Sequence, residues 1–368
     1  LFTRINTESN TPAVIHTKIV PGNSIKLSVS IKGAGSENMS AVKMFKPSAD
    51  SSEIVDFVVK TVKQAGANPC PPIRLGIGIG GSFEQAAILA KKALLEPIKS
   101  EEYLKKRAEK DKIAELQCEI FKKVNELGIG AAGMGGNNTI YGVNILTSST
   151  HIAALPVAVN INCHSSRHAE AIITENDINY NYEPFKYDFL NDLPVDSSVR
   201  TISLDDISAI KKLKAGDEVL LSGIIYTARD AAHKELINCI NSNQELPFDI
   251  KNKIIFYVGP CPAMKGEIIG PSGPTTASRM DRFAPVLYDL GMLGSIGKGE
   301  RSPEVVESIK KNQGVYFITS GGIAVLLSQK IKKAEIIAFP GLGPEAIYRL
   351  EVENFPVVVG IDSKGNCI

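Results

Sequence analysis

The stretch from Asn68 to Ala87 reads NPCPPIRLGIGIGGSFEQAA and decides the fold of the N-terminal half. A cysteine lies among prolines, a short apolar segment follows, and a glycine cluster leads into an alanine-rich segment that begins after Ser82. This order predicts a buried strand over 73–79, a tight turn, and a helix over 82–95. A strand that turns directly into a helix is the unit of an α/β domain.

The glycine cluster has two interpretations. Gly76, Gly78 and Gly81 match the G-x-G-x-x-G pattern of dinucleotide sites. The first two lie within the predicted strand rather than after it, and no acidic residue closes a following strand at the expected distance. No Gly-Lys-Ser/Thr sequence follows, so the pattern is not a P-loop. Close backbone packing at the strand-to-helix turn is the favoured interpretation, and an NAD-dependent oxidoreductase remains a weaker alternative.

Two isolated cysteines are candidate metal ligands. Cys70 lies between prolines, which stiffen the backbone and remove N–H donors, although a buried free cysteine also fits that position. Cys163 ends a predicted strand and is followed by the polar run HSSRH. None of the six cysteines forms a CxxC pair, which argues against a disulfide framework and for a reducing compartment. Separate single cysteines fit an iron–sulfur site with ligands from distant segments.

The composition excludes several partners. Hydrophobic residues make up 43% and charged residues 22% of the 368 residues, and the formal net charge is +1. This balance gives no attraction to nucleic acid or to an anionic membrane surface. No apolar run approaches the roughly 20 residues of a membrane-spanning helix. The chain starts Leu-Phe-Thr-Arg without a leader, which suggests a start inside a longer protein and leaves targeting unreadable.

The pattern along the chain predicts a mixed α/β (α+β) protein of two domains. Residues 14–31 alternate around a Pro-Gly turn and predict a β-hairpin, 51–65 predict a helix, and 101–127 a long helix or helix pair. Residues 174–200 have no sustained period, and short strands alternate with helices beyond them. The predicted divisions are a domain over 1–175, a linker over 176–194, and a second domain over 195–368.

The second domain carries cations on turns next to glycine or helix starts. Arg229 lies in TARDAAH, Thr275, Thr276 and Arg279 lie in GPTTASRMD, and Lys298 lies in GKG. A lone arginine is usually a solvated surface group. Three such turns in one domain instead favour a site for a small dianion, since arginine clamps a carboxylate with two parallel hydrogen bonds.

At these residues the chain resembles the class I, iron–sulfur-dependent fumarate hydratases and the related tartrate dehydratases. The segments NTPAVIH, KGAGSEN, NPCPP, GIGIGGSFEQAA, GIGAAGMGGNN and HIAALPVAVNINCHSSRHAEA are similar to the α-type part of that family. TARDAAH, YVGPCPA, GPTTASRMD, GKG and FPVVVGIDSKGN are similar to the β-type part. The resemblance covers nearly the whole chain and implies both parts fused in one polypeptide.

The resemblance implies a cluster-binding α/β domain, a swivelling β/β/α-type C-terminal domain, and a homodimer with substrate held between the domains. It also implies a [4Fe–4S] cluster on three cysteines with one iron open to substrate. Cys70 and Cys163 match two of these ligands. The third belongs to a Cys-Gln-Asp-Thr-Gly-like motif that precedes NTPAVIH in the family and is not found here. Cys261 is not a match for that ligand.

The implied activity is the reversible hydration of fumarate to (S)-malate, with the open iron as a Lewis acid. By the resemblance, the groups that bind substrate are Gly35, through its backbone N–H, together with Arg229, Thr276, Arg279 and Lys298. A tartrate or methylfumarate (mesaconate) hydro-lyase of the same family is the first alternative. An inactive truncated chain without a complete cluster is the second.

Two residues match the family's proton-transfer groups. Thr275 matches the acceptor of the carbon-bound proton, a role for which a threonine hydroxyl needs a neighbouring carboxylate. His151 matches a histidine suited to proton transfer with the departing or attacking oxygen, although a histidine at a strand start also fits a structural role. We expect a cytoplasmic protein, or one of an organellar matrix, with a dicarboxylate substrate and neither nucleic acid nor membrane as partner.

Overall fold

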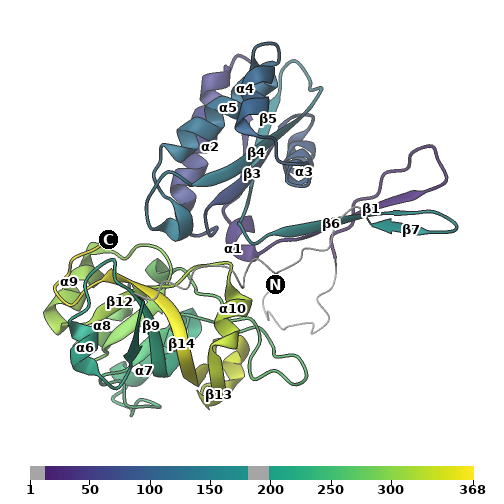
Figure 1. Cartoon of the computed structure of the whole chain (residues 1–368). Coiled ribbons are helices and arrows are strands. Elements are labelled where there is room, and N and C mark those ends of the chain that lie inside the picture. The colour runs from purple at the N-terminus through teal and green to yellow at the C-terminus, as the bar shows by residue number, and fades with distance from the viewer. Residues whose placement is uncertain (1–12, 181–198) are drawn as a thin grey trace.

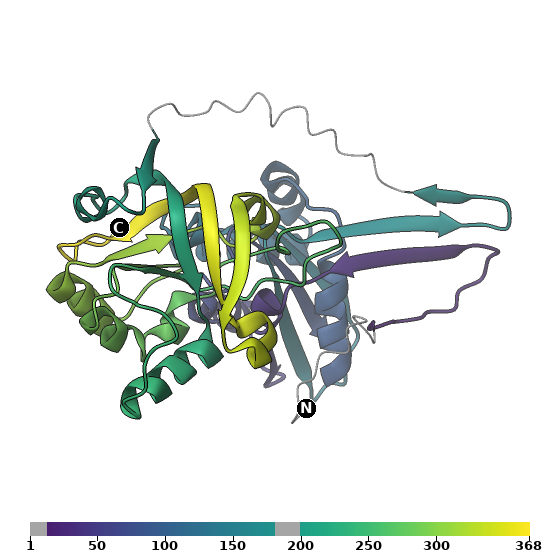
Figure 2. The ribbon, with the colours of Figure 1, turned by 90° about the horizontal axis from the view of Figure 1, so that it is seen from below.

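The computed structural model describes residues 13–180 and 199–368, which form two mixed α/β domains and a three-stranded arm (Figure 1). The N-terminal domain contains a four-stranded sheet, and the C-terminal domain contains a seven-stranded one. The predicted fold class, mixed α/β in two domains, is confirmed. The arm extends away from both domains, which is clearest in the view of Figure 2.

The N-terminal sheet has the strand order β2-β5-β3-β4, with β3 parallel to β4 and antiparallel to β5. Its strands are β2 (Ala41–Phe45), β3 (Ile73–Gly80), β4 (Ile140–Ser148) and β5 (Leu155–Asn162). The helices are α1 (Ala34–Glu37), α2 (Ser51–Ala65), α3 (Phe83–Ala93), α4 (Glu101–Ala108) and α5 (Lys112–Asn125), with a 3₁₀ turn η1 (Ala131–Gly133). The predicted helix over 51–65 is confirmed, and the 101–127 segment is a helix pair.

The helices cover both faces of this sheet. The apolar stripes of α2 and α5, which include Val55, Val58 and Ile120, form one core with the strands. α2 begins at a capping box, in which Asp50 accepts from the Glu53 N–H and the Glu53 side chain accepts from the Asp50 N–H. α3 packs on the opposite face through alanines, so β3 is buried on both sides.

The glycines of β3 are packing residues. A Cβ at Gly76 would lie 2.1 Å from the Ala90 carbonyl oxygen, and one at Gly78 would lie 2.0 Å from that of Ala86. Only glycine therefore allows α3 to approach the strand this closely. The packing interpretation of the cluster is confirmed.

The arm consists of β1 (Ile25–Ile31), β6 (Arg167–Ile173) and β7 (Ile178–Tyr180). β1 pairs antiparallel with β6, from Ile25 opposite Ile173 to Ile31 opposite Arg167. The predicted hairpin over 14–31 is therefore wrong, since residues 13–20 form no strand. Alternation identifies a strand but not its partner, and here the partner is distant in sequence.

Part of the predicted linker is structured. Within the range 176–194, β7 pairs with β6, and residues 181–198 lie outside the described part of the chain. The domain boundaries at 175 and 195 stay predictions.

The C-terminal sheet has the order β13-β14-β12-β11-β10-β9-β8, with a further β14–β9 pairing. That pairing closes β14, β12, β11, β10 and β9 into a ring around one core, and α7, α8 and α9 pack on a second core outside it. The strands are β8 (Arg200–Ser203), β9 (Glu218–Thr227), β10 (Ile254–Phe256), β11 (Gly294–Gly297), β12 (Val315–Ile318), β13 (Ile331–Ala338) and β14 (Ile347–Ile361). The helices are α6 (Ile207–Lys211), α7 (Asp230–Asn241), η3 (Ala277–Met280), α8 (Ala284–Asp289), α9 (Pro303–Asn312), α10 (Ala324–Gln329) and η4 (Pro340–Glu345).

Across both described ranges, every helix is too short or too polar to span a membrane.

Candidate active site

The two domains meet where Lys298 reaches Cys70. The Lys298 Nζ donates to the Cys70 Sγ and to the Asn68 carbonyl oxygen, each at 2.8 Å. Lys298 follows β11 and is only 7% exposed. A buried ammonium needs strong acceptors, and here they come from the other domain. The contact joins two residues that the sequence analysis selected on separate grounds.

The backbone around Cys70 is held from several sides. Cys70 has a left-handed φ of 58°, which is uncommon for a residue other than glycine. Its N–H donates to the Ala67 carbonyl at 3.1 Å, and its own carbonyl accepts from the His164 Nδ1 at 3.1 Å. The Ala132 N–H bonds the Pro71 carbonyl at 2.8 Å. These contacts fix the direction of the thiol.

Cys163 lies next to this loop because it directly follows β5 and precedes His164. Its Sγ contacts the Ser165 hydroxyl at 3.0 Å. Thiols are soft donors that suit iron–sulfur clusters, so Cys70 and Cys163 fit two corners of such a group. Within the described ranges, no three His, Cys, Asp or Glu side chains gather as a metal site.

A glycine pair after β12 closes against both cysteine loops. A Cβ on Gly321 would lie 2.3 Å from the Cys70 Sγ, and one on Gly322, whose φ is +85°, would lie 2.6 Å from the His164 ring. A side chain at either position would push the domains apart. These glycines make the close approach of Lys298 to Cys70 possible.

Thr275 and Thr276 lie beside Lys298 through backbone hydrogen bonds. The Lys298 N–H donates to the Thr275 carbonyl at 3.2 Å, and the Ala277 N–H donates to the Lys298 carbonyl at 2.9 Å. Thr276 and Lys298 thus form an isolated parallel bridge, and Thr276 caps η3. The structure therefore brings together Cys70, Thr275, Thr276 and Lys298.

The two arginines lie on different elements, which Asp230 connects, since it follows Arg229 and pairs with Arg279. Arg279 on η3 makes a two-pronged ion pair with Asp230, with Nε–Oδ1 at 3.1 Å. Arg229 precedes α7, and its Nη2 lies 3.6 Å from the Glu345 Oε1. The buried Nε of Arg229 has no hydrogen-bond partner among the described residues. A buried donor without an acceptor fits an anionic ligand at this position.

The helix behind Arg229 is anchored by a buried histidine. His233 on α7 is 0% exposed, and its Nδ1 donates to the Arg229 carbonyl at 2.9 Å. Its ring packs against Tyr257 and Phe283. Burial lowers the pKa of His233 to about 4, so the imidazole is neutral at physiological pH. It therefore holds Arg229 in place without adding charge to the site.

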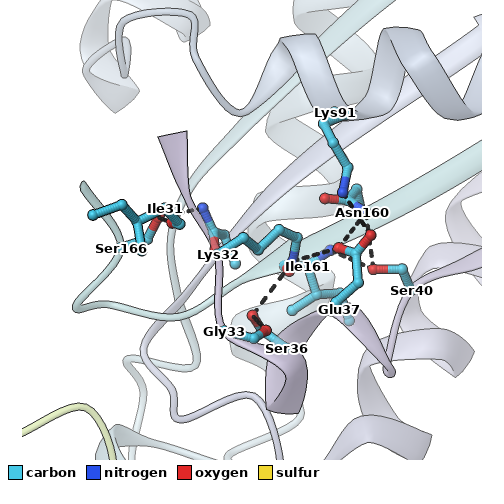
Figure 3. A network of polar contacts seen from close by, with 11 residues as sticks. Ile31, Lys32, Gly33, Ser36, Glu37, Ser40, Lys91, Asn160, Ile161 and Ser166 are labelled. Carbon is cyan, nitrogen blue, oxygen red and sulfur yellow. Dashed lines mark hydrogen bonds and ion pairs between the residues drawn. The ribbon is translucent and has the colours of Figure 1, made fainter. Parts of the chain in front are cut away.

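Gly35 lies on α1, against the same Asn68 carbonyl that Lys298 contacts. A Cβ on Gly35 would lie 3.4 Å from that oxygen. Figure 3 shows how α1 is fastened: Glu37 forms ion pairs with Lys32 at 3.0 Å and with Lys91 at 2.5 Å. Asn160 of β5 also donates to Glu37 at 3.3 Å.

The charges in this network are strongly coupled. Burial works to raise the pKa of Glu37, but the hydrogen bonds and charges of Lys91 and Lys32 outweigh it and hold that pKa at about 2. Burial lowers the pKa of Lys32, opposed by Glu37 and, more weakly, by Cys163. Lys32 therefore lies near Cys163.

His151 is not part of this group. It is exposed in the turn before β5, where its Nδ1 accepts from the Ala153 N–H at 3.1 Å. Cys163 lies at the other end of that eight-residue strand, which is about 26 Å long. The catalytic role of His151 stays a prediction that the single chain does not support.

Sequence reasoning missed several residues at the domain contact, namely Lys32, Asn68, His164, Gly321 and Gly322. The polar run after Cys163 and the Gly-Gly pair after β12 were signals in the sequence. Asn68 contributes only its carbonyl oxygen, which no side-chain pattern reveals.

A cavity of about 1000 Å³ lies elsewhere, beside α4, α5 and β4. Its lining includes Leu104, Cys118, Phe121 and Val143 and none of the residues at the domain contact. Its lining also holds Cys118 and Lys105, but none of the residues that the sequence analysis selected as site candidates, so we place the candidate site at the domain contact.

The fold and the domain contact define a two-domain α/β protein with thiol and cationic groups gathered where the domains meet. Residues 1–172 match the family model described as fumarate hydratase (Fumerase), and residues 177–368 match the one described as fumarase C-terminus. The chain therefore belongs to the class I fumarate hydratase family. As a member of it, the chain is an enzyme, a hydro-lyase.

Named relatives agree. The anaerobic class I fumarate hydratase of Escherichia coli K12 is 30% identical over 383 residues, covering 100% of this chain and 69% of that protein. Fumarate hydratase 2 of Leishmania major is 31% identical over 386 residues, covering 100% of this chain and 67% of that protein. A putative L(+)-tartrate dehydratase alpha subunit of Methanocaldococcus jannaschii is 49% identical over 138 residues, 38% of this chain and 46% of that protein.

Proposed function

We propose that the protein catalyses the reversible hydration of fumarate to (S)-malate at the contact between its two domains. The observation that carries the proposal is the position of Lys298, whose ammonium lies 2.8 Å from the Cys70 thiol. A cation for a carboxylate and a thiol for a metal group therefore lie at one point. The names of the relatives, fumarate hydratases with coverage of the whole chain, supply the substrate.

The dicarboxylate would be held by cations on turns. Arg229, with its unpartnered Nε, and Arg279 pair with one carboxylate, and Lys298 pairs with the other. The backbone at Gly35 and the Thr276 hydroxyl complete the polar contacts. Arg229 and Arg279 already have partners in Glu345 and Asp230, so substrate shares or displaces those carboxylates. The acidic partners keep both guanidinium groups ordered before substrate arrives.

In the direction of dehydration, malate loses a proton from carbon and its hydroxyl leaves as water. Thr275 is proposed to accept the carbon-bound proton, together with a carboxylate that lowers the cost of deprotonating its hydroxyl. Its backbone is fixed by hydrogen bonds with the Tyr257 carbonyl and the Lys298 N–H. The notion that His151 transfers a proton at the oxygen rests on the resemblance alone, because His151 lies at the opposite end of β5 from Cys163.

We propose that Cys70 and Cys163 are ligands of a [4Fe–4S] cluster. When bound, a cluster with an open iron supplies a Lewis acid for the substrate hydroxyl and one carboxylate. The chain's own contribution is to hold the loop of Cys163 against Cys70, through the His164 contact with the Cys70 carbonyl, and to keep Lys298 beside the Cys70 thiol. Thiol ligands require reducing conditions, so we keep the cytoplasm or an organellar matrix as the predicted location.

The test is turnover by full-length protein prepared without oxygen. We expect fumarate hydration, a broad iron–sulfur absorption, and loss of both on exposure to air. Activity in air-stable, iron-free protein would overturn the cluster assignment. Protein that neither binds iron nor turns over fumarate would favour the inactive chain.

The tartrate dehydratase relative supports a second candidate, hydro-lyase activity on tartrate, and mesaconate is a further one. Comparing kcat/KM for fumarate, mesaconate and L(+)-tartrate decides among them, since each substrate differs at the reacting carbons. We expect fumarate to have the highest value. We also propose a homodimer, which light scattering on the purified protein tests.

A further inference from the structure

A buried polar cluster lies directly beneath the Lys298 turn and has no part in the roles assigned so far. It contains Tyr257, Asp281, Arg301 and Tyr316 from four different segments of the C-terminal domain. The Arg301 side chain is 0% exposed. Burying a guanidinium costs free energy unless nearby acceptors and negative charge compensate. The burial of Arg301 therefore indicates a role for its side chain.

Arg301 connects the two loops that carry the proposed substrate groups. Its Nε donates to the Asp281 Oδ1 at 2.7 Å, and the other oxygen of Asp281 accepts from the Ser302 N–H at 2.7 Å. Asp281 ends the segment that begins with Thr275, whereas Arg301 and Ser302 follow Lys298 by three and four residues. The ion pair thus clamps one loop to the other.

Arg301 also supports a tyrosine that holds the turn itself. Its guanidinium carbon lies 5.0 Å from the Tyr316 ring centre and 5.4 Å from that of Tyr257. The Tyr316 hydroxyl donates to the Gly299 carbonyl at 2.8 Å. Gly299 has a φ of +78° and directly follows Lys298, so this bond fixes the turn that presents the ammonium.

We infer that Arg301 is a positioning residue, which acts through Asp281 and Tyr316 to hold the Lys298–Gly299 turn in register with the Thr275–Arg279 segment. The inference rests on the proposed function, because it makes Lys298 a substrate contact. Two backbone hydrogen bonds join these segments directly, and the Arg301 cluster joins them a second time through side chains. Without the cluster, the position of the Lys298 ammonium relative to the Thr275 hydroxyl is no longer fixed.

The mildest variant is Tyr316→Phe, which removes only the hydroxyl that bonds Gly299. The matched control is Tyr288→Phe, because Tyr288 is equally buried and its hydroxyl makes no bond to the turn. That hydroxyl bonds the Val315 carbonyl at 3.1 Å and the Ser295 hydroxyl at 3.0 Å, and it reaches Arg301 only through Ser295. Arg301→Lys keeps the charge but loses the planar fork. The double variant of Tyr316→Phe and Arg301→Lys measures whether the two residues act together.

Two measurements are made on each full-length, anaerobically prepared variant. The first is KM and kcat for fumarate, and the second is amide hydrogen exchange over residues 275–279 and 297–302. We expect Tyr316→Phe and Arg301→Lys each to raise KM and the exchange rate of both segments about 5- to 10-fold, the usual effect of one lost buried hydrogen bond. In the double variant, the increase in KM should be smaller than the product of the two single increases. Tyr288→Phe should lower thermal stability while leaving KM and the exchange rates of both segments unchanged.

Equal KM and exchange in Tyr316→Phe and Tyr288→Phe would overturn the inference, and so would faster exchange in Tyr316→Phe with an unchanged KM. If the wild-type protein does not turn over fumarate, the proposed function fails. Hydrogen exchange then still decides whether Arg301 holds the turn, so the two failures are distinguishable.

Discussion

At the scale of single residues, Lys298 is the central residue of the site, because its side chain contacts the N-terminal domain and its backbone pairs with the loop of Thr275 and Thr276. Its ammonium is buried against a thiol and a backbone carbonyl. In the proposed function, a substrate carboxylate supplies the counter-charge.

We expect Lys298→Met to lower kcat/KM for fumarate by about 10- to 100-fold, the range for a lost hydrogen bond to a charged group. Steady-state kinetics measures this effect. Lys60→Met, which changes an exposed lysine on α2, is the control and should match the wild type. Equal losses in both variants would remove Lys298 from the binding site.

His233 predicts a pH dependence of stability. The unfolded imidazole has a pKa near 6.5 and the folded one about 4, so between these values the unfolded state binds the extra proton. The contribution of His233 to the free energy of unfolding is therefore fully present above pH 6.5. It is lost as the pH is lowered toward 4, by a total on the order of 3 kcal/mol.

Urea unfolding followed between pH 4 and pH 7 measures this loss. His233→Gln, which keeps a donor for the Arg229 carbonyl, should flatten the curve over that interval. A curve with the same slope in His233→Gln would show that other groups cause the acid destabilisation.

At the scale of elements, the sequence predicted the central strand and helix of the N-terminal domain and assigned the glycines correctly to packing. Periodicity and capping are local signals, so the helix over 51–65 and the strand from Ile73 could be identified. The partner of β1 could not be predicted, because β6 begins more than a hundred residues later in the chain. Pairing of distant strands depends on tertiary contacts that a single sequence does not display.

The same limit applies to the site. The cysteines and the cationic turns stand out by residue type and by resemblance, and the structure brings Cys70 and Lys298 into contact. The buried cluster of Arg301 and Tyr316 belongs to no sequence motif. It could not be predicted, because it forms only when folding brings the ring and the guanidinium together. The match of His151 to the family's residue type likewise could not show that it lies at the far end of β5.

The packing of α3 on β3 gives a test at this scale. Gly78→Ala places a Cβ 2.0 Å from the Ala86 carbonyl, where only a shift of the helix relieves the clash. We expect a loss of about 3 kcal/mol or more in unfolding free energy. Gly341→Ala, where nothing lies within 4 Å of the added Cβ, is the control and should change little. Thermal and urea unfolding measure both, and equal stability would show that the helix is not tightly packed there.

At the scale of the whole molecule, we expect activity to depend on how closely the two domains approach. Gly321 lies in the C-terminal domain and against Cys70 of the N-terminal one, so Gly321→Ala changes the contact without entering either core. We expect at least a tenfold loss of kcat/KM, with thermal unfolding close to that of the wild type, since neither core loses packing. Wild-type kinetics in Gly321→Ala would mean that the approach of the domains seen here is not needed for catalysis.

The central claim is that the contact of Cys70 with Lys298 is the site of a cluster-dependent hydration of fumarate. The most direct measurement follows fumarate and malate in full-length protein prepared without oxygen, in wild type and Cys70→Ser, with iron content determined on the same samples. We expect the wild type to interconvert fumarate and (S)-malate and to contain iron and sulfide. We expect Cys70→Ser to stay folded and to lose both iron and turnover. Full activity and iron content in Cys70→Ser would contradict the central claim.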